Sequence, residues 1–395
     1  MNNHTIKPVT FQALFRLFRK FIDFTVLFYR FSLEKSFFVC YNKHIILIYL
    51  WRFLKMEEKK IRVGIMGLQF GLRHMEGAME NGYEIGAICD TLPGRLKDYG
   101  TEYKIPEDRW YTDYRDCLNI GLDVVVLAVP DQMHRQMSED FLAAGVNVLC
   151  EKPLALNRED LCAIIKAEKA STARFMVGQV CRFTANFILA KQMIDEGKIG
   201  DIYFIESEYA HDYMKIVSNE KNWRADPARH GMIGGGCHAV DLMRWIAGDP
   251  YEIMAYGTHK LLPTVPYNDA TIAIMKFPND VIGKVFCSTG CKRSYTMRTL
   301  IYGTKGTIIC DNTSPTITYF GVNEDQTTKK AEEIPVGTVN NHNVKEEIKV
   351  FVDAILNNKP IQMSATEGAK SAQACISIVE SSDTGKIVHP NYNFD

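Results

Sequence analysis

The sequence lacks a long apolar run, an excess of charge of one sign and any closely spaced pair of cysteines. The apolar run Ile45–Trp51 has seven residues, whereas a helix that crosses a membrane needs about 20. Lys+Arg and Asp+Glu number 46 and 47, so the formal net charge is −1. A balanced charge gives a protein no general attraction for nucleic acid or for a membrane surface. We therefore expect neither of them as a partner.

The 11 cysteines are odd in number and irregularly spaced, and no CxxC pair occurs among them. Cys287 and Cys291 stand nearest to each other, in a β-rich stretch without further Cys or His close by. A disulfide framework or a structural zinc site would show more regular spacing and closer ligand pairs. The pattern therefore predicts reduced thiols, no metal site and a cytoplasmic protein.

Residues 1–55 differ in composition from the remainder of the chain. They contain many phenylalanines, no glycine and one proline, and charged residues interrupt every longer apolar window. No small-residue cleavage site follows an apolar stretch, which argues against a secretory signal. Met56 then leads into an apolar strand, so we expect residues 1–55 to lie outside the functional enzyme, as a mis-assigned start. An amphipathic segment on a membrane surface is the alternative interpretation.

Residues 56–180 alternate short apolar runs with helical segments, which predicts a doubly wound parallel sheet of the Rossmann type in an α/β domain. The runs are bounded by turn residues, as buried strands are. The chain of 395 residues exceeds the roughly 250–300 that a single core accommodates, so a second domain is expected. The expected strands are Ile61–Met66, Glu84–Cys89, Val124–Ala128, Val146–Cys150 and Phe175–Gly178, and the expected helices are Met133–Ala144 and Arg158–Ser171, with Asn157 as the cap of the latter.

Residues 181–395 are richer in β-type runs, separated by hairpin-type breaks such as Pro278-Asn279-Asp280. They predict an α+β domain with a mostly antiparallel open sheet, covered by helices on one face. A free apolar face on the other side predicts a homodimer or homotetramer. Two terminal helices, 344–357 and 366–384, are expected to pack back on the first domain. The expected strands are 202–209, 252–258, 271–277, 282–288, 299–302 and 306–310, after a helix at 186–196.

The first strand runs into a glycine-rich turn, Gly67-Leu68-Gln69-Phe70-Gly71. Such a turn lets the backbone approach a pyrophosphate, which the N-terminus of the next helix attracts. Gln69 stands where the usual fingerprint has glycine, so the motif alone is as consistent with a structural turn. Asp90 ends the second strand 23 residues after Gly67, near the spacing of about 20 expected for an acid that binds the ribose. A strand-end cap is its simpler role. Together, the glycine-rich turn and Asp90 predict NAD as the cofactor. NADP is the second possibility, since the carboxylate would repel its 2′-phosphate.

Three further segments resemble signatures of the glucose–fructose oxidoreductase, inositol dehydrogenase and MocA-type (Gfo/Idh/MocA) oxidoreductase family. The likeness runs from about Lys60 to the C-terminus, and the Glu-Lys-Pro element with its preceding strand is its most specific part. The matching segments are Pro130–His134 (P-x-x-x-H), Gly145–Pro153 (G-x-x-V-x-x-E-K-P) and Gly234–Asp241 (a glycine-rich H-x-x-D segment), with weaker likenesses at Arg182 and Trp223–Pro227.

The resemblance implies that Lys152 hydrogen-bonds the substrate hydroxyl and helps to position the nicotinamide, and that Glu151 contacts the nicotinamide or its ribose. Lys152 stands at the carboxyl end of a parallel strand, where open α/β sheets bind ligands, and Pro153 restricts its backbone to an extended conformation. The remaining residues expected at the cofactor are Val129, Pro130, His134 and Arg182, and those expected at the substrate, besides Lys152, are Trp223, Arg224, His238 and Asp241.

His238 is the expected general base, because an unperturbed histidine titrates near pH 6.5. Asp241 is placed three residues later, so the two can share a helix face. We prefer a role as cap or supporting partner for Asp241, and no further ligands cluster here to favour a metal. Gly234 departs from the family, in which many members have an acidic residue four positions before the matching histidine. The departure points to a different substrate or an altered chemistry, with Tyr209, His211, Asp212 and Tyr213 as weaker candidates for replacement polar groups.

These observations predict an NAD(P)-dependent oxidoreductase that transfers a hydride between the cofactor and a hydroxyl or carbonyl carbon of a sugar, cyclitol or sugar derivative. In that reaction Lys152 polarises the oxygen while His238 removes the hydroxyl proton. Two alternatives stay open. One is a glycoside hydrolase that oxidises its substrate transiently and releases sugar without net NADH. The other is a non-catalytic homologue that senses a dinucleotide or a sugar.

Overall fold

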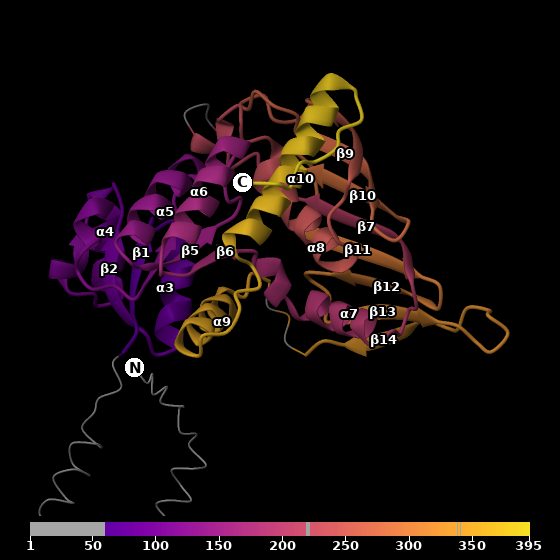
Figure 1. The fold of residues 1–395 in the computed structure, drawn as a ribbon, viewed down its shortest axis with the longest axis horizontal. Helices are drawn as coiled ribbons and strands as arrows, with labels where there is room; N and C mark the ends of the chain where they lie inside the picture. Colours follow the sequence, from indigo (N-terminus) through magenta and orange to yellow (C-terminus); the bar gives the residue numbers. More distant parts are fainter. Residues whose placement is uncertain (1–59, 219–221, 338, 340) are drawn as a thin grey trace, which may run out of the picture. The chain divides into compact units, whose positions relative to one another are not determined.

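Two β-sheets organise residues 61–395 of the computed structural model (Figure 1). The structure describes residues 60–218, 222–337, 339 and 341–395. Our expectation that residues 1–55 are not part of the enzyme concerns a segment outside these described residues. The contacts within Ile61–Asp395 join both sheets into a single unit, and the boundary that we placed between residues 180 and 181 stays a prediction.

The first sheet has six parallel strands in the order β3-β2-β1-β4-β5-β6, which confirms the Rossmann-type prediction. Strand β4 is buried at all four of its positions, as expected for a parallel sheet with helices on both faces. The strand order reverses between β1 and β4, and a crevice for ligands opens at the carboxyl ends on either side of such a reversal. The strands are β1 (Arg62–Met66), β2 (Glu84–Cys89), β3 (Trp110–Tyr111), β4 (Val124–Leu127), β5 (Asn147–Glu151) and β6 (Phe175–Gly178).

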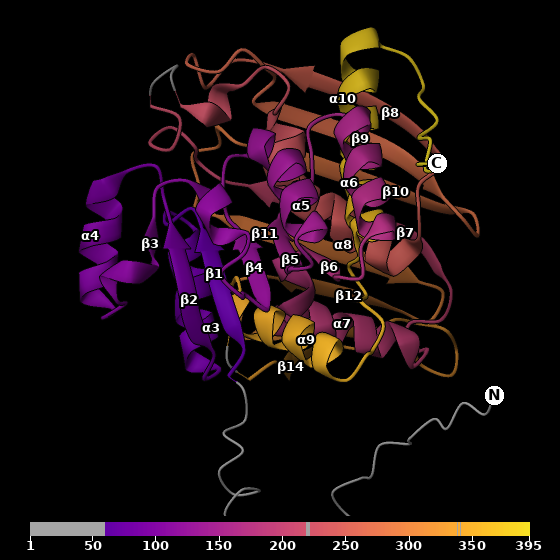
Figure 2. The same cartoon turned by 60° about the vertical axis from the view of Figure 1, so that its left-hand side comes forward.

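Helices cover both faces of this sheet, as the two views show (Figures 1 and 2). On one face the apolar side chains of α3 (Gly71–Glu80), α4 (Pro93–Glu102) and α9 (Val344–Leu356) share a core with β1 and β2. On the other face α5 (His134–Ala143), α6 (Arg158–Ala170) and the first turns of α10 (Ala365–Thr384) share a second core with β4 and β5. The expected cap of α6 is present, since Asn157 Oδ1 accepts from the Asp160 amide at 2.9 Å.

The second sheet has eight strands in the order β14-β13-β12-β11-β7-β10-β9-β8. All its pairs are antiparallel except β7 with β10, which confirms the mostly antiparallel prediction. The turn between β9 and β10 contains Asn279 and Asp280, both with φ of 60°, a conformation that tight hairpins favour. The strands are β7 (Ile202–Ala210), β8 (Glu252–Thr258), β9 (Ala270–Phe277), β10 (Val281–Ser288), β11 (Thr296–Gly303), β12 (Gly306–Asp311), β13 (Thr316–Gly321) and β14 (Glu332–Pro335).

Helices pack on one face of the second sheet. The helix α8 (Cys237–Ala247) lies on β7 and β10, α7 (Ala185–Asp195) lies on β12, and α10 lies on β8. Strand β9 alternates between buried and exposed positions along its length, which identifies its second face as open. The large apolar side chains exposed on the strands of this sheet are Tyr203, Tyr256, Ile272, Ile274 and Ile282.

The cysteines of the described residues are all free thiols, in agreement with the absence of a disulfide framework in the sequence pattern. A cytoplasmic location stays a prediction. Among the helices of the described residues, none combines the length and the apolar character that crossing a membrane requires.

Candidate active site

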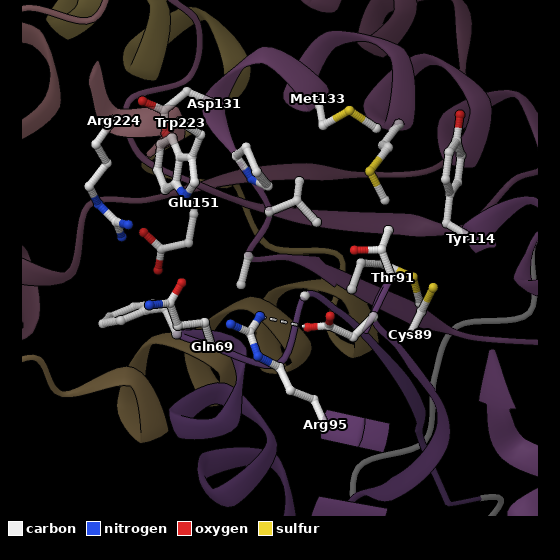
Figure 3. Close-up of a pocket in the computed structure, with 18 of the residues that line it drawn as sticks. Gln69, Cys89, Thr91, Arg95, Tyr114, Asp131, Met133, Glu151, Trp223 and Arg224 are labelled. Atoms are coloured by element: carbon white, nitrogen blue, oxygen red, sulfur yellow. Dashed lines mark hydrogen bonds and ion pairs between the residues drawn. The ribbon is translucent and has the colours of Figure 1, made fainter. Parts of the chain in front are cut away.

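A cavity of about 630 Å³ opens at the carboxyl ends of the parallel strands, where the strand order predicts a ligand. Its lining combines the glycine-rich turn and the ends of β2, β4 and β5 with residues that come much later in the chain. Figure 3 shows Cys89, Thr91 and Tyr114 towards one end, and Glu151, Trp223 and Arg224 towards the other. Of the residues expected at the cofactor or substrate, those that line the cavity are Gly67, Gln69, Phe70, Asp90, Val129, Pro130, Glu151, Lys152, Trp223 and Arg224.

The glycine-rich turn forms a backbone cradle that side chains would fill. Gly67 has φ of +85°, and a Cβ there would lie 2.4 Å from the carbonyl oxygen of Ala128. A Cβ at Gly71 would lie 2.9 Å from Ile65. Helix α3 begins at Gly71, so its free N–H groups point towards the cradle. This geometry fits the pyrophosphate of a dinucleotide, and it favours the ligand-binding interpretation of the turn over the purely structural one.

Asp90 is 7% exposed and lines the same cavity. Its Oδ2 accepts from the Leu68 amide at 2.9 Å, and its Oδ1 accepts from the Leu92 amide at 2.9 Å. Arg95 Nη1 lies 3.3 Å from Oδ2. The strand-end cap that we weighed as the simpler role is therefore present, and the carboxylate is also placed where a ribose would lie. The two roles coexist because a carboxylate has about four acceptor positions.

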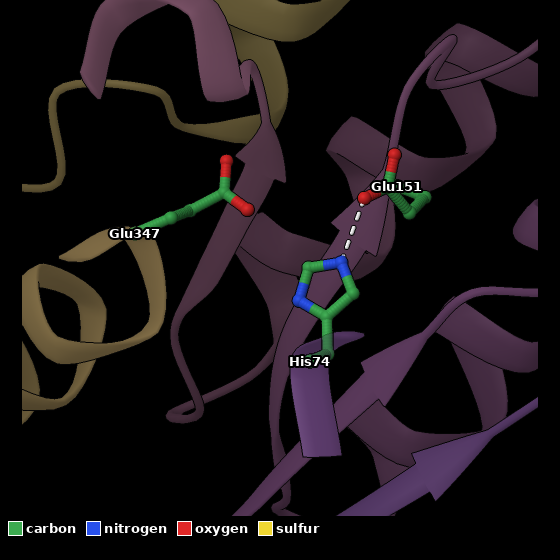
Figure 4. Close-up of side chains that lie close together, drawn as sticks. All are labelled: His74, Glu151 and Glu347. Carbon is green, nitrogen blue, oxygen red and sulfur yellow. Dashed lines mark hydrogen bonds and ion pairs between the residues drawn. The ribbon is translucent and has the colours of Figure 1, made fainter. Parts of the chain in front are cut away.

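Glu151 belongs to a buried cluster with His74 and Glu347 (Figure 4). Its Oε1 lies 2.7 Å from His74 Nε2, and its Oε2 accepts from the Lys152 amide at 3.1 Å. Burial raises the pKa of Glu151, but the hydrogen bond and charge of His74 and the charge of Lys152 outweigh it, and the net shift is downward. Glu151 is therefore a carboxylate at neutral pH, held at the cavity wall.

Glu347, on α9, has neither carboxyl oxygen hydrogen-bonded within the described residues, and the Nδ1 atom of His74 is also without a partner there. Burial and the charge of Glu151 raise the pKa of Glu347 well above its usual range. The three side chains have ligand atoms within 4.8 Å of one another, which would suit a metal. The direct bond between His74 and Glu151 already uses one ligand atom of each, so a proton on Glu347 accounts for the cluster more simply. Our sequence analysis missed both His74 and Glu347.

Lys152 follows the end of β5 and lies against the π-helical turn η6 (Met232–Gly236), where its Nζ atom donates to the Gly234 carbonyl at 3.3 Å. The peptide bond between Lys152 and Pro153 is cis. Burial lowers the pKa of the amine, but Cys237, Tyr213 and Glu151 outweigh it and the net shift is upward. Lys152 is therefore an ammonium ion that can donate to a substrate oxygen.

His238 follows Gly234 by one helical turn and is 1% exposed. Its Nδ1 atom lies 3.1 Å from the Cys181 sulfur, and its ring stacks on Tyr209 at 6.0 Å between centroids. Burial, the charge of Lys152 and the neighbouring imidazoles of His342 and His211 hold the pKa of His238 well below its usual range. A neutral imidazole therefore lies close to the Lys152 ammonium. His238 is not itself part of the cavity lining.

His342 is the residue that joins the cavity to His238, and sequence reasoning missed it. It lines the cavity, lies edge-to-face against His238 at 5.8 Å and also contacts the ring of Phe70 at 6.2 Å. Burial and the nearby Lys152 lower its pKa to about 4. Nothing in the sequence around His342 forms a motif, so no local signal could have identified it.

The polar residues that we considered as replacements for the missing acid lie beside His238. Tyr209 and Tyr213 share a hydrogen bond of 2.9 Å between their hydroxyls, and Tyr209 also bonds His211 Nδ1 at 3.1 Å. Both tyrosines are buried. We considered these residues weak candidates because isolated polar residues usually lie at the surface. For the two tyrosines, a surface position was the wrong expectation.

Arg182 and Asp241 pair with each other and do not line the cavity. Arg182 Nε and Nη2 lie 2.7 and 2.8 Å from the two carboxylate oxygens of Asp241, which also accepts from Ser371 at 2.6 Å. A bidentate pair of this kind satisfies both charges. The pairing positions both side chains beside the segment that carries His238. The expected cofactor contact of Arg182 and the expected substrate contact of Asp241 stay predictions.

His134 likewise lies behind the cavity wall. Its Nδ1 atom is 2.9 Å from the carbonyl oxygen of Pro153, and its Nε2 atom is 3.3 Å from that of Val129. The ring holds together two turns that do line the cavity, those at Val129–Pro130 and at Lys152. This supporting position is what the structure shows for His134, and the expected cofactor contact stays a prediction.

The guanidinium of Arg229 occupies the space that a side chain at position 234 would need. A Cβ at Gly234 would lie 2.0 Å from Arg229 Nη1. Arg229 is buried, and its Nε donates to Asp131 at 2.8 Å. Nearby, the guanidinium carbons of Arg224 and Arg229 lie 4.1 and 4.9 Å from the ring centre of Trp223. The position that is acidic in many members of the family is thus occupied by a cation here.

Comparison with known families matches both halves of this architecture. The model described as "Oxidoreductase family, NAD-binding Rossmann fold" matches residues 61–179, and the GFO/IDH/MocA C-terminal domain matches residues 187–309. Among curated relatives, inositol 2-dehydrogenase of Salmonella typhimurium is 24% identical over 252 residues, which cover 62% of this chain and 72% of that protein. Inositol 2-dehydrogenase/D-chiro-inositol 3-dehydrogenase of Lactiplantibacillus plantarum is 24% identical over 64% of this chain and 72% of that protein.

Solved structures show the same fold. Levoglucosan dehydrogenase in complex with NADH and L-sorbose superposes with a TM-score of 0.76 at 21% identity, over 84% of this chain and 99% of that one. The scyllo-inositol dehydrogenase of Lactobacillus casei, with NAD(H) and scyllo-inositol, gives a TM-score of 0.72 at 23% identity, over 84% and 99%. Because family models match residues 61–179 and 187–309, the chain belongs to the Gfo/Idh/MocA family and is an oxidoreductase with an NAD-binding Rossmann fold.

Proposed function

We propose that the protein transfers a hydride between NAD and a CH–OH carbon of a sugar, a cyclitol or a derivative of one. The observation that carries the proposal is that an ammonium group in the cavity wall contacts the segment that carries a neutral imidazole. Lys152 contacts the Gly234 carbonyl, and His238 lies one helical turn further on. A cation that stabilises a developing alkoxide and a base that takes its proton are what oxidation of an alcohol needs.

The residues of this chain divide the work as follows. Lys152 donates to the substrate oxygen. We assign to His238 the tautomer with its proton on Nδ1, facing the Cys181 sulfur, which leaves Nε2 to accept the hydroxyl proton. Glu151, fixed by His74, holds the nicotinamide ribose or carboxamide, and the Gly67 turn holds the pyrophosphate. When bound, NAD supplies the hydride acceptor, and the protein supplies orientation and electrostatics.

We further propose NAD in preference to NADP. Asp90 has backbone partners on both oxygens and is buried, so it cannot turn away from a 2′-phosphate. Arg95 reduces the repulsion between Asp90 and a 2′-phosphate, and its side chain is 37% exposed. In NADP-specific proteins of this fold, a nearby arginine accommodates the phosphate. We expect a preference for NAD of about tenfold to a hundredfold in kcat/KM, which matches the loss of one charge-assisted contact.

A screen of sugars, inositols and sugar acids for NADH formation tests the proposal, run with both NAD and NADP. The control is the double variant Lys152→Met/His238→Asn, which should abolish turnover that this site performs. Turnover that survives in the double variant would contradict the roles of Lys152 and His238. Release of a sugar from a glycoside without net NADH would instead identify the hydrolase.

We also propose that the open face of the second sheet joins copies of the chain. Ile272, Ile274 and Ile282 are exposed there at 40%, 59% and 46%, and adjacent exposed apolar side chains of this size mark interaction surfaces. Light scattering should give a dimer or tetramer mass, and Ile274→Lys should lower it. Leu356→Lys, at an exposed position on α9, is the matched control, and a wild-type monomer would contradict the proposal.

A further inference from the structure

The end of the cavity near Lys152 carries more positive than negative groups. Lys152, Arg224 and Arg229 line it, against Asp131 and Glu151. The histidines around it add no charge at neutral pH, because burial lowers the pKa of His211, His238 and His342. The other charged residues of the lining are already matched, since Arg95 pairs with Asp90 and Arg115 pairs with Asp113. One positive charge at the Lys152 end is therefore left over.

Arg229 is the most constrained of these cations. Its side chain is 4% exposed, its Nε atom bonds Asp131, and its Nη1 atom has no hydrogen-bond partner within the described residues. A buried guanidinium N–H without an acceptor destabilises a protein unless a ligand supplies one. The same Nη1 atom lies where a side chain at Gly234 would begin, and Lys152 Nζ bonds the Gly234 carbonyl. Two cations thus meet at one peptide group.

Arg224 adds to this excess. Its guanidinium lies over the same indole ring as that of Arg229, and it forms no ion pair with any carboxylate in the part of the chain that the structure describes. Burial and the charge of Arg229 both lower its pKa, which shows that its surroundings disfavour a second cation. A bound anion would counter the charge of Arg229 that Arg224 experiences.

The pyrophosphate of the cofactor does not account for Arg229. A pyrophosphate belongs at the Gly67 turn and the N-terminus of α3. Arg229 instead abuts Gly234, on the segment that carries His238, and it lies beside the lysine that faces the substrate in the reaction proposed above. The Nη1–H group of Arg229 that has no acceptor within the described residues is therefore on the substrate side of the cavity.

We infer that the substrate is a hydroxy acid of the sugar-acid class, whose carboxylate binds Arg229 and Arg224 while its reacting hydroxyl lies at Lys152. A planar carboxylate matches the planar fork of a guanidinium, and a single negative charge balances the single excess positive charge. The absence of a side chain at Gly234 is what makes room for Arg229. This inference rests on the proposed hydride transfer for the position of the hydroxyl, but the carboxylate site stands on its own contacts.

The test compares neutral sugars with acids that differ only by a carboxylate: D-glucose with D-glucuronate, and D-galactose with D-galacturonate. We expect the acid of at least one pair to have a kcat/KM about tenfold or more above its neutral partner, as a charge-assisted hydrogen bond provides. The same acids are titrated into the protein saturated with NADH, by calorimetry at 50 and 300 mM salt. Binding that weakens with salt identifies an electrostatic site.

Variants test which arginines bind the substrate carboxylate. Arg229 alone cannot be removed cleanly, because Asp131 would be left buried without its partner. The neutral pair Asp131→Asn/Arg229→Gln and the single Arg224→Met should each reduce the ratio of acid to neutral kcat/KM by about tenfold. The matched control is Arg135→Gln, which removes an arginine with comparable ion pairs on α5, away from the cavity lining, and should keep the ratio.

The outcomes separate the two proposals. Oxidation of the neutral sugars without preference for the acids would overturn the carboxylate site and leave the dehydrogenase standing. Binding of the acids to the NADH-loaded protein without turnover, lost in the Asp131→Asn/Arg229→Gln variant, would support the carboxylate site and count against the dehydrogenase. Acid binding that is unchanged in both variants would overturn the site. So would the absence of both binding and preference.

Discussion

The two ends of the cavity are built in different ways. The cradle at the cofactor end is made of backbone, at the turn that joins β1 to α3, and its shape follows from two glycines. The substrate end is made of side chains from the end of β5, the segment around Trp223–Arg229 and the loop at His342. The first is a local structure that many dinucleotide-binding proteins share. The second depends on residues that only folding brings together, so it is where the substrate is chosen.

The largest effect in this comparison should come from the substrate end. The substitution His238→Asn removes the proton acceptor and keeps a polar group of similar size. We expect kcat to fall by about 10²–10⁴-fold, while the Kd for NADH, measured by fluorescence, changes little. Loss of NADH binding in this variant would show that the two ends are not separate.

The pH dependence of stability should also come from the substrate end. The pKa of His342 is lowered to about 4, so the unfolded state binds its proton first as the pH falls below about 6.5. Stability is therefore greatest above pH 6.5 and declines towards pH 4, with His342 contributing about 3 kcal/mol of that loss. Thermal unfolding between pH 7.5 and 4.5 measures the decline.

His342→Phe keeps the ring and removes the titration. The variant should show a shallower decline between pH 6.5 and 4 than the wild type, even though His211 and His238, whose pKa values are also lowered, still titrate. Identical slopes in the two proteins would mean that His342 is solvated and outside the cluster.

The cofactor end is tested by Gly67→Ala. The new Cβ would lie 2.4 Å from a backbone oxygen, and the residue has φ of +85°, so the turn must move. We expect the Kd for NADH to rise by about 10- to 100-fold. Gly82→Ala is the control, since Gly82 has φ of +79° but nothing within 4 Å of a Cβ. That variant should lose about 1 kcal/mol of stability and bind NADH normally.

The smallest effect should come from Glu347, which supports the cofactor end from α9. Its pKa is raised, so the carboxyl is stable in its protonated form and destabilises the fold as the pH rises above about 4.5 towards the folded pKa. Glu347→Gln copies the neutral form of the side chain. We expect it to raise the free energy of unfolding by about 1 kcal/mol at pH 8 and by less at pH 5, which thermal unfolding at the two pH values measures. Destabilisation by the glutamine at pH 8 would instead indicate an ionised carboxylate or a metal ligand.

Most of the first domain could be predicted from the sequence. Strands β2 and β6 have the bounds that we expected, and β1, β4 and β5 differ by one residue at one end or at both. The short strand β3 and the strands β13 and β14 were missed, because they are short or only partly buried and lack a run of apolar residues. Among the site residues, the pairing of Arg182 with Asp241 was not predicted, because a motif shows which residues are close in sequence, not which way they face.

The sequence by itself determined the parallel sheet, the glycine cradle and the placing of Lys152 at a strand end, because each depends on a periodicity or a backbone conformation encoded within a few residues. Only the tertiary structure decided that Arg229 fills the space beside Gly234, that His342 joins His238 to the cavity, and that Glu347 meets His74. Those contacts connect segments far apart in the chain. Tertiary packing decides which buried charged groups are paired, and no local sequence pattern encodes that packing.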